Sequence, residues 1–175
     1  DTLQQCELSI LPKTMDIMAL AYGAVIAEAV ENLTEDYSPQ EEIFILLQQA
    51  LVLLSSHNKR LVVVSSLCKL LSLCGFDPEL ETCTTCHEKI EGDAYFSTVQ
   101  GGVVCDNCST GAELPFAVGT RELMLKLQHL DFENPEKFVV RGADLMQLEQ
   151  TLYKFLVYQT DKPLVSLQFL AQMSV

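Results

Sequence analysis

The sequence contains no apolar run long enough to cross a membrane. A helix that spans a bilayer needs about 18 or more consecutive apolar residues. The longest apolar stretch, residues 43–54, is interrupted by Gln48 and Gln49, so we interpret it as a helix buried in a globular core. No segment of the kind found in signal peptides precedes it. We therefore expect no membrane among the partners of this protein.

Positive charge is also scarce. The 175 residues include 11 Lys and Arg against 24 Asp and Glu, a net charge of −13. Acidic residues concentrate in residues 28–42 and 77–93, whereas six basic residues meet seven acidic ones from Arg121 onward. Such a surface repels phosphate backbones, so this chain alone is not expected to bind nucleic acid tightly. The scattered basic residues, none of which the sequence assigns to DNA or to a partner, include Lys59, Arg60, Arg121, Lys126, Arg141, Lys154 and Lys162.

The motifs of common active sites are missing as well. The sequence has three histidines, and it contains no H-E-x-x-H element, no phosphate-binding glycine loop and no nucleophile elbow. Metal-dependent deamination would need an H-x-E element, but none of His57, His87 and His129 is followed two residues later by glutamate. We therefore expect no catalytic residues and no enzymatic activity.

The sequence does have seven cysteines, four of which form two C-x2-C pairs separated by eighteen residues. Two residues between the cysteines of a pair let a tight turn direct both sulfurs to one point, and the gap can hold a hairpin. Four thiolates would complete a tetrahedral shell without a position for water, so the metal would be structural. The spacing therefore predicts one structural zinc ion, bound by Cys83, Cys86, Cys105 and Cys108.

Other interpretations of these cysteines are two disulfides, four free thiols or a redox pair. A redox role needs a lowered thiol pKa, and the acidic neighbours Glu81 and Glu88 oppose it. His87, beside Cys86, could compete as a ligand, although four thiolates already fill the shell. An odd number of cysteines cannot all pair, which favours a reducing, cytoplasmic compartment. The other three are expected to be small buried hydrophobes on apolar stretches: Cys6, Cys68 and Cys74.

Hydrophobic periodicity predicts a mainly α fold, a helical bundle domain with an inserted small zinc-ribbon-like β-hairpin module. The hairpin strands are expected at residues 94–99 and 102–105, with a turn at Gln100-Gly101-Gly102. The two helical parts are expected to share one core, because neither flank alone carries enough inward leucines. The expected divisions are residues 1–12, the end of a preceding domain or a linker; 13–80, the first helical part; 81–112, the zinc module; and 113–175, the second helical part.

Three helices are expected before the module. The second begins with the capping box Ser38-Pro39-Gln40-Glu41 and is apolar nearly all round, so we expect it to be central. The third follows a turn at residues 55–58 and runs to Cys74, with Gly75 ending it. The inward residues expected on the first two helices are Met18, Tyr22, Val25, Ile26, Ala29, Leu33, Phe44, Leu47, Leu51 and Leu54.

Three more helices are expected after the module. Thr120 is expected to cap a short helix that Asn134-Pro135 breaks, and a longer helix follows. Lys162-Pro163 marks a last turn before a short terminal helix. The inward residues expected here are Leu123, Met124, Leu127, Leu130, Leu145, Leu148, Leu152, Phe155, Leu156, Leu164, Leu167, Leu170 and Met173.

Several of these segments, taken together, carry a family resemblance. Leu70-Leu71-x-x-x-Gly75-Phe76-x-Pro78-x-Leu80 leads into the cysteine pairs, and Tyr95-Phe96-Ser97 and Gly101-Gly102-Val103-Val104-Cys105 follow. With Leu20-Ala21-Tyr22 and Glu28 on the first helix, and Lys162-Pro163-Leu164-x-Ser166-x-x-Phe169-Leu170 at the end, the sequence resembles the RecO family of bacterial recombination and repair proteins. The resemblance covers nearly the whole chain.

This resemblance implies a non-enzymatic mediator of the RecF pathway that binds and anneals DNA. It would work with RecR and single-stranded DNA-binding protein to help load RecA, in the bacterial cytoplasm on the nucleoid. Family members carry an N-terminal OB-fold, of which residues 1–11 would be the last strand or the exit linker. Single- and double-stranded DNA would be bound through the full-length protein. The alternative is a zinc-ribbon interaction subunit of other nucleic-acid machinery, which would not need the lead-in and the closing segment together.

Two positions depart from the family pattern. His87 stands where many relatives place glycine, and Val165 replaces a position that is often basic. The second departure weakens the idea that the closing segment holds the acidic tail of single-stranded DNA-binding protein. That tail would suit a groove between helices with one basic residue at its rim, which the sequence does not identify.

Overall fold

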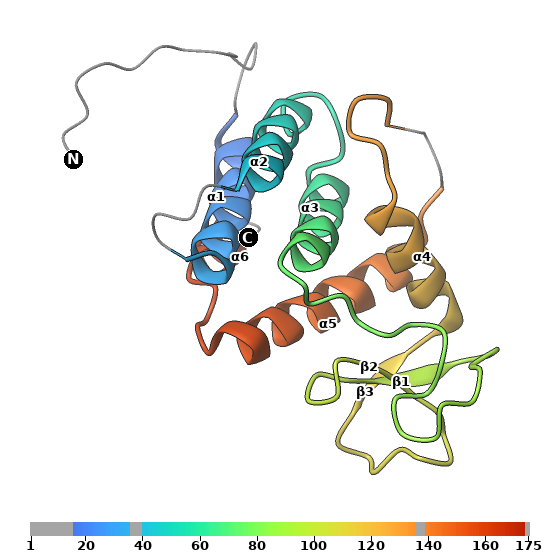
Figure 1. Cartoon of the computed structure of the whole chain (residues 1–175). Coiled ribbons are helices and arrows are strands. Elements are labelled where there is room, and N and C mark those ends of the chain that lie inside the picture. Colours follow the sequence, from blue (N-terminus) through green and yellow to red (C-terminus); the bar gives the residue numbers. More distant parts are fainter. Residues whose placement is uncertain (1–15, 36–39, 136–138, 174–175) are drawn as a thin grey trace.

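The computed structural model describes residues 16–35, 40–135 and 139–173. These residues form a mainly helical fold with one small antiparallel sheet, as the sequence predicts (Figure 1). The predictions for residues 1–12 and for the cap at Ser38-Pro39 lie outside the described residues. The elements in chain order are α1 (Ile17–Leu33), α2 (Glu41–Leu53), α3 (Lys59–Leu73), β1 (Ala94–Ser97), β2 (Gly102–Val104), β3 (Leu114–Phe116), α4 (Val118–Gln128), α5 (Gly142–Thr160) and α6 (Ser166–Met173).

Helix α3 occupies the centre of the bundle. It packs against α1, α2, α4 and α5, and residues 62–68 are all buried. Asn58 begins the helix by accepting a hydrogen bond from the Leu61 backbone N–H, and Gly75 follows its end in the left-handed conformation, as predicted. The β-branched run Val62–Val64 is helical, because burial of all three side chains in the core outweighs their preference for strands.

The prediction that the second helix is central was wrong. Helix α2 packs on α3 and α1, and it leaves Phe44 64% exposed and Ile45 42% exposed. Its four buried residues lie along a single face. An apolar residue pattern on every side of a helix therefore did not predict which helix lies at the centre of the bundle. Helix α3 is the buried helix although it carries the polar residues Ser65 and Ser66. Both serines lie in the core, where their hydroxyl groups form hydrogen bonds.

Helix α1 buries three of the residues expected on its inner face, Val25, Ile26 and Ala29, together with further small residues. Ala19, Ala21, Gly23 and Ala29 are buried beside Val25 and Ile26, whereas Met18, Tyr22 and Leu33 are only partly buried. Small residues let two helix backbones approach closely, so this face contacts both α3 and α6. Asp16 begins the helix by accepting a hydrogen bond of 2.7 Å from the Ala19 backbone N–H.

The first helix after the module begins earlier than predicted. Helix α4 starts at Val118, and Thr120 lies inside it, fully buried, with its hydroxyl donating to Gln147 Oε1 of α5 at 2.5 Å. Thr120 is therefore not a cap. The helix ends at Gln128, six residues before Asn134, so Asn134-Pro135 does not break it. Helix α5 buries the predicted residues Leu145, Leu148, Leu152, Phe155 and Leu156.

The sheet has three strands, one more than predicted, and the third, Leu114–Phe116, lies just beyond the predicted end of the module at residue 112. Their order is β2-β1-β3, with Phe96 of β1 opposite both Val103 and Leu114. The sheet lies beyond α4 and one end of α5, away from α1 and α2 (Figure 1). The Phe96 ring contacts the Phe116 ring of β3 and the Phe155 ring of α5, with centroids 5.3 Å and 5.4 Å apart. These aromatic contacts hold the sheet against the bundle.

Two motifs from opposite ends of the chain meet in space. The Glu28 carboxylate on α1 accepts hydrogen bonds from the backbone N–H of Val165 at 2.7 Å and of Ser166 at 2.8 Å, and from the Ser166 hydroxyl. It therefore caps α6 from another helix, where a negative charge is also favoured by the helix dipole. Leu164 and Leu170 of the closing segment are buried. Glu28 thus holds the closing segment against α1.

Among the residues that the structure describes, no helix has both the length and the apolar character needed to cross a membrane.

Replacing Glu28 should loosen α6. Glu28→Ala should lower the free energy of unfolding by about 1 kcal/mol at neutral pH, because three donors at a helix start lose a charged acceptor that is partly open to solvent. Glu31→Ala, an exposed position on the same helix, is the control and should have little effect. Urea denaturation measures both, and equal losses would contradict the role of Glu28.

The same contact should depend on pH. Partial burial raises the pKa of Glu28, but the hydrogen bonds from Ser166 and Val165 outweigh it and lower the pKa below its usual value of 4.5. A lowered carboxyl pKa stabilises the fold above the unfolded pKa and loses that effect as the pH falls. The difference between the parent and Glu28→Ala should therefore be full at pH 7 and shrink below about pH 4.5.

Candidate metal centre

The first cysteine pair sits in a tight turn closed by backbone hydrogen bonds. The Cys83 N–H donates to Glu88 O at 2.9 Å, and the Ile90 N–H donates to Glu81 O at 2.9 Å, so residues 81–90 form a small hairpin of their own. At its tip the His87 N–H donates to Cys83 O at 2.8 Å. His87 has a φ of 61°, the left-handed region that favours glycine. This explains why glycine suits the position that follows the second cysteine.

The second pair follows strand β2 in a similar turn. The N–H groups of Cys108 and Ser109 donate to Cys105 O at 3.1 and 3.0 Å. The Glu113 carboxylate then accepts from Ser109 Oγ and from the backbone of Thr110 at 2.9 and 3.0 Å. These contacts, together with its own backbone N–H, lower the pKa of Glu113 to about 2. An ionised Glu113 therefore fixes the chain directly after the turn.

The two turns are brought together by a close backbone approach. The Val103 N–H donates to Glu79 O at 2.8 Å, and the Thr84 N–H donates to Val103 O at 2.9 Å. A Cβ atom at Gly102 would stand 2.6 Å from Glu79 O and 2.8 Å from Thr84 Cγ2. Only glycine leaves room for this contact, so Gly102 is required for the first turn to lie against β2. The same segment covers the free edge of β2.

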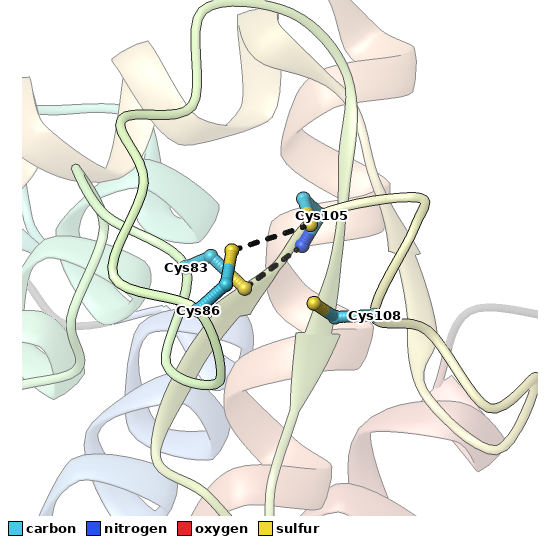
Figure 2. A group of neighbouring side chains, drawn as sticks. All are labelled: Cys83, Cys86, Cys105 and Cys108. Carbon is cyan, nitrogen blue, oxygen red and sulfur yellow. Dashed lines mark hydrogen bonds between the residues drawn. The ribbon is translucent and has the colours of Figure 1, made fainter.

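The four sulfurs of these turns converge (Figure 2). All four Sγ atoms lie within 4.8 Å of one another, and those of Cys86 and Cys105 are 3.8 Å apart. Disulfides need about 2.05 Å, and the four cysteines are free. A tetrahedral site with zinc–sulfur bonds of about 2.3 Å has edges of about 3.8 Å. The donor set therefore fits one four-coordinate thiophilic metal, and His87 is not part of the cluster.

The electrostatics of the cluster fit a metal as well. Burial raises the pKa of the Cys83 thiol, but backbone N–H groups, including those of Cys105 and Thr85 at 3.4 Å, outweigh this and lower it to about 6. The neighbouring sulfur of Cys105 instead raises the pKa of Cys108, to about 12. Four adjacent thiols cannot all ionise without a cation among them, because like charges repel. A bound cation would remove that restriction.

The other cysteines lie apart from this cluster. Cys68 is fully buried on α3, and burial raises the pKa of its thiol to about 12, as expected for a small core residue. Cys74 is half-buried at the end of α3, and Cys6 lies outside the described residues. Cys68 and Cys74 are thus less easily ionised than a free thiol, since burial also raises the pKa of Cys74.

The scattered basic residues have different surroundings. Lys59 pairs with Asp16 at 3.1 Å, Arg60 pairs with Glu149, and Arg141 lies 3.7 Å from Asp144. Arg121 is buried, and its Nη1 has no hydrogen-bond partner in the part of the chain that the structure describes. Of the others, Lys126 lines a pocket of about 200 Å³ with Arg141, and Lys126, Lys154 and Lys162 are exposed.

A groove between α2, α3 and the segment after α4 was not identified from the sequence. It has a volume of about 450 Å³, and Ile45, Leu46, Leu73 and Phe132 line it. Lys69 lies in this groove, with its Nζ donating to Gln128 O at 3.0 Å and 5.4 Å from the centre of the Phe132 ring. Burial lowers the pKa of Lys69. The sequence signal that could have indicated this groove is Lys69, a charged residue within the largely apolar segment of residues 61–71.

Fold and site together define a class of protein: a helical domain that carries an inserted four-cysteine module with two knuckles. Residues 15–168 match the family model described as Recombination protein O C terminal. The chain therefore belongs to the RecO family of DNA repair and recombination proteins.

Individual relatives agree with this assignment. The chain is 30% identical over 174 residues to the DNA repair protein RecO of Pelotomaculum thermopropionicum, covering 97% of this chain and 68% of that protein. It is 27% identical over 175 residues to the RecO protein of Desulforamulus reducens, again covering 97% and 68%. With the RecO protein of Bacillus pumilus it shares 28% identity over 177 residues, 98% of this chain and 69% of that one.

The left-handed backbone at His87 gives a direct test of the knuckle. His87→Gly should raise the free energy of unfolding by about 0.5–1 kcal/mol, because glycine adopts this conformation without a Cβ clash. The matched control is Glu88→Gly, next along the turn and without a positive φ, which should lower stability. Both are measured by chemical denaturation, and a His87→Gly variant no more stable than Glu88→Gly would contradict the assignment.

Proposed function

We propose that this chain is the helical, zinc-containing portion of a non-enzymatic mediator of the RecF pathway. The full-length protein would bind single- and double-stranded DNA, anneal complementary strands, and work with RecR and single-stranded DNA-binding protein to help load RecA in the bacterial cytoplasm. The observation that carries this proposal is the family match over residues 15–168, together with the convergence of the two cysteine pairs.

The metal is proposed to be a single structural zinc ion, held by Cys83, Cys86, Cys105 and Cys108. Zinc favours four thiolates in a tetrahedral arrangement, and a closed shell leaves no site for chemistry on a substrate. The metal would add to the small core of the module, because the strands β1 and β2 are only three or four residues long. We also propose that residues 81–112 form this module and that the flanking helical parts fold as one unit with it. One contiguous cluster of buried residues, which runs from α1 to α6 and includes Phe96 and Val103, supports that division.

Zinc content tests the site. The purified protein should contain one zinc ion per chain, and Cys105→Ser should lose the metal and lower the melting temperature. Structural zinc in small peptides contributes roughly 10 to 16 kcal/mol of apparent binding free energy. Cys74→Ser is the control, because that thiol lies outside the cluster, and it should keep its zinc. Absence of zinc from protein purified without chelator would refute the proposal.

DNA contact is proposed to come mainly from outside this chain. Of the eleven Lys and Arg residues, three lie beside carboxylates and Arg121 is buried, which reduces the number that can neutralise phosphates. The acidic module would be repelled by the duplex at low salt. A role in positioning partners, with the DNA held elsewhere in the full-length protein, fits this distribution of charge.

Titration against labelled single-stranded DNA tests whether DNA binding comes mainly from outside this chain. This chain alone should bind more weakly than micromolar at physiological salt, with a small dependence on salt concentration, because scattered lysines release few counterions. The full-length protein is the comparison and should bind and anneal. Submicromolar binding by this chain would show that its basic residues converge on DNA after all.

The groove around Lys69 is proposed as the site for the acidic tail of single-stranded DNA-binding protein. Among the described residues Lys69 has no carboxylate within ion-pair distance, and it lies among apolar side chains. An apolar terminal residue could be buried against Leu73 and Phe132 while its carboxylate meets the ammonium group. Burial would give affinity and the charge would set the register. Glu42 and Asp131 also line the groove, and the charge of Asp131 acts on Lys69, so a peptide carboxylate would share the ammonium group with Asp131.

A short acidic peptide that ends in an apolar residue tests this assignment. Lys69→Met should weaken its binding about tenfold, because one buried charge-assisted contact is lost. Lys154→Met, an exposed lysine on α5, is the control and should leave binding unchanged. Fluorescence anisotropy measures both, and equal affinities for the two variants would exclude the groove.

A further inference from the structure

The four ligand sulfurs differ in how far solvent reaches them. Cys83 is buried, Cys105 and Cys108 are partly buried, and Cys86 is exposed. The Cys83 sulfur also accepts hydrogen bonds from the backbone N–H groups of Thr85 and Cys105, both at 3.4 Å. A dissolved oxidant would therefore meet Cys86 first.

The Cys86 sulfur contacts a sulfur of the other turn. The Sγ atoms of Cys86 and Cys105 are 3.8 Å apart, and Figure 2 shows them facing each other across the cluster. A disulfide needs a separation of about 2.05 Å, so a movement of less than 2 Å would bring them to bonding distance. The sulfur of Cys83, the sequence partner of Cys86, accepts two backbone hydrogen bonds.

We propose that the metal centre is a peroxide-sensitive switch in which oxidation joins Cys86 to Cys105 and releases the metal. The inference rests on the proposed zinc site and concerns these same residues. Its particular claim is the pairing, because a bond between Cys86 and Cys105 links the two knuckles. A bond within either C-x2-C pair would leave the knuckles unconnected.

The chemistry requires one molecule of hydrogen peroxide for each disulfide. The Cys86 thiolate attacks one peroxide oxygen, which breaks the O–O bond and gives Cys86 sulfenic acid and hydroxide. The Cys105 thiolate then attacks the Cys86 sulfur, forms the S–S bond and expels the second oxygen as hydroxide. Two protons convert both hydroxides to water, so two sulfurs are oxidised by two electrons and peroxide is reduced.

Loss of two thiolates removes half of the ligand set. Cys83 and Cys108 alone cannot complete a tetrahedral shell, so the zinc leaves. The new covalent bond joins the same two turns that the metal joined, and the hydrogen bonds between Thr84, Val103 and Glu79 are unaffected by it. The oxidised module should therefore remain closed, and a thiol reductant with added zinc should restore the original state.

The experiment treats the zinc-loaded protein with hydrogen peroxide. Released zinc is followed with a chromogenic chelator, and the disulfides are mapped by mass spectrometry of proteolytic peptides. The expected result is one zinc released per Cys86–Cys105 disulfide, with recovery after dithiothreitol and zinc. The double variant Cys68→Ser/Cys74→Ser is the control, because both thiols lie outside the cluster, and it should behave as the parent does.

Proteolysis supplies a second readout. Protein stripped of zinc by a chelator under reducing conditions should be cut within residues 81–112 at least tenfold faster than the oxidised protein, since only the latter keeps its knuckles joined. Disulfides within either C-x2-C pair, or zinc retained under millimolar peroxide, would overturn the switch and leave the zinc site standing. Protein that carries no zinc at the start would overturn the proposed metal site and the switch together.

Discussion

The fold depends on one helix that can be surrounded on all sides. Helix α3 accepts neighbours on every face because the polar groups it brings into the core are satisfied there. The Ser66 hydroxyl donates to Val62 O of its own helix at 2.7 Å, and the Ser65 hydroxyl donates to Leu127 O of α4 at 2.8 Å. Unsatisfied, each hydroxyl would cost free energy comparable to a lost hydrogen bond. The second bond also fixes the end of α4 against α3.

The module is tied to this bundle through a small aromatic contact and one covalent chain connection at each end. Phe96 lies between Phe116 of its own sheet and Phe155 of α5. The Val118 N–H at the start of α4 donates to Asp93 Oδ1 at 2.9 Å. Asp93, the residue just before β1, therefore caps the helix that follows β3. The position of the cysteine cluster relative to the helices therefore follows from the α4–α5 pair rather than from the knuckles themselves.

The segments that resemble the RecO family in sequence form contacts in the structure that hold distant parts of the chain together. Glu28 of the opening helix accepts hydrogen bonds from the backbone N–H groups of Val165 and Ser166 in the closing segment. The lead-in after α3 carries Glu79, whose backbone pairs with Gly101 and Val103 and so delivers the first cysteine turn to β2. These residues are far apart in sequence, and each alone is a weak motif. Their combination is informative because they form the contacts that close the fold at its two ends.

Sequence alone determined the features that arise from local spacing. The cysteine pairs predicted the cluster because two intervening residues allow only tight turns, and α3, α5 and the β1–β2 hairpin followed from periodicity and from Gly75 and Gly101. Only the tertiary structure decided which helix is central, where Thr120 lies, and that Leu114–Phe116 adds a third strand. Each of these depends on a partner distant in sequence: Leu127 for Ser65, Gln147 for Thr120, and β1 for a three-residue strand too short to show periodicity. The Lys69 groove belongs to the same class, because the residues that line it come from α2, α3 and the segment after α4, and only packing brings them together.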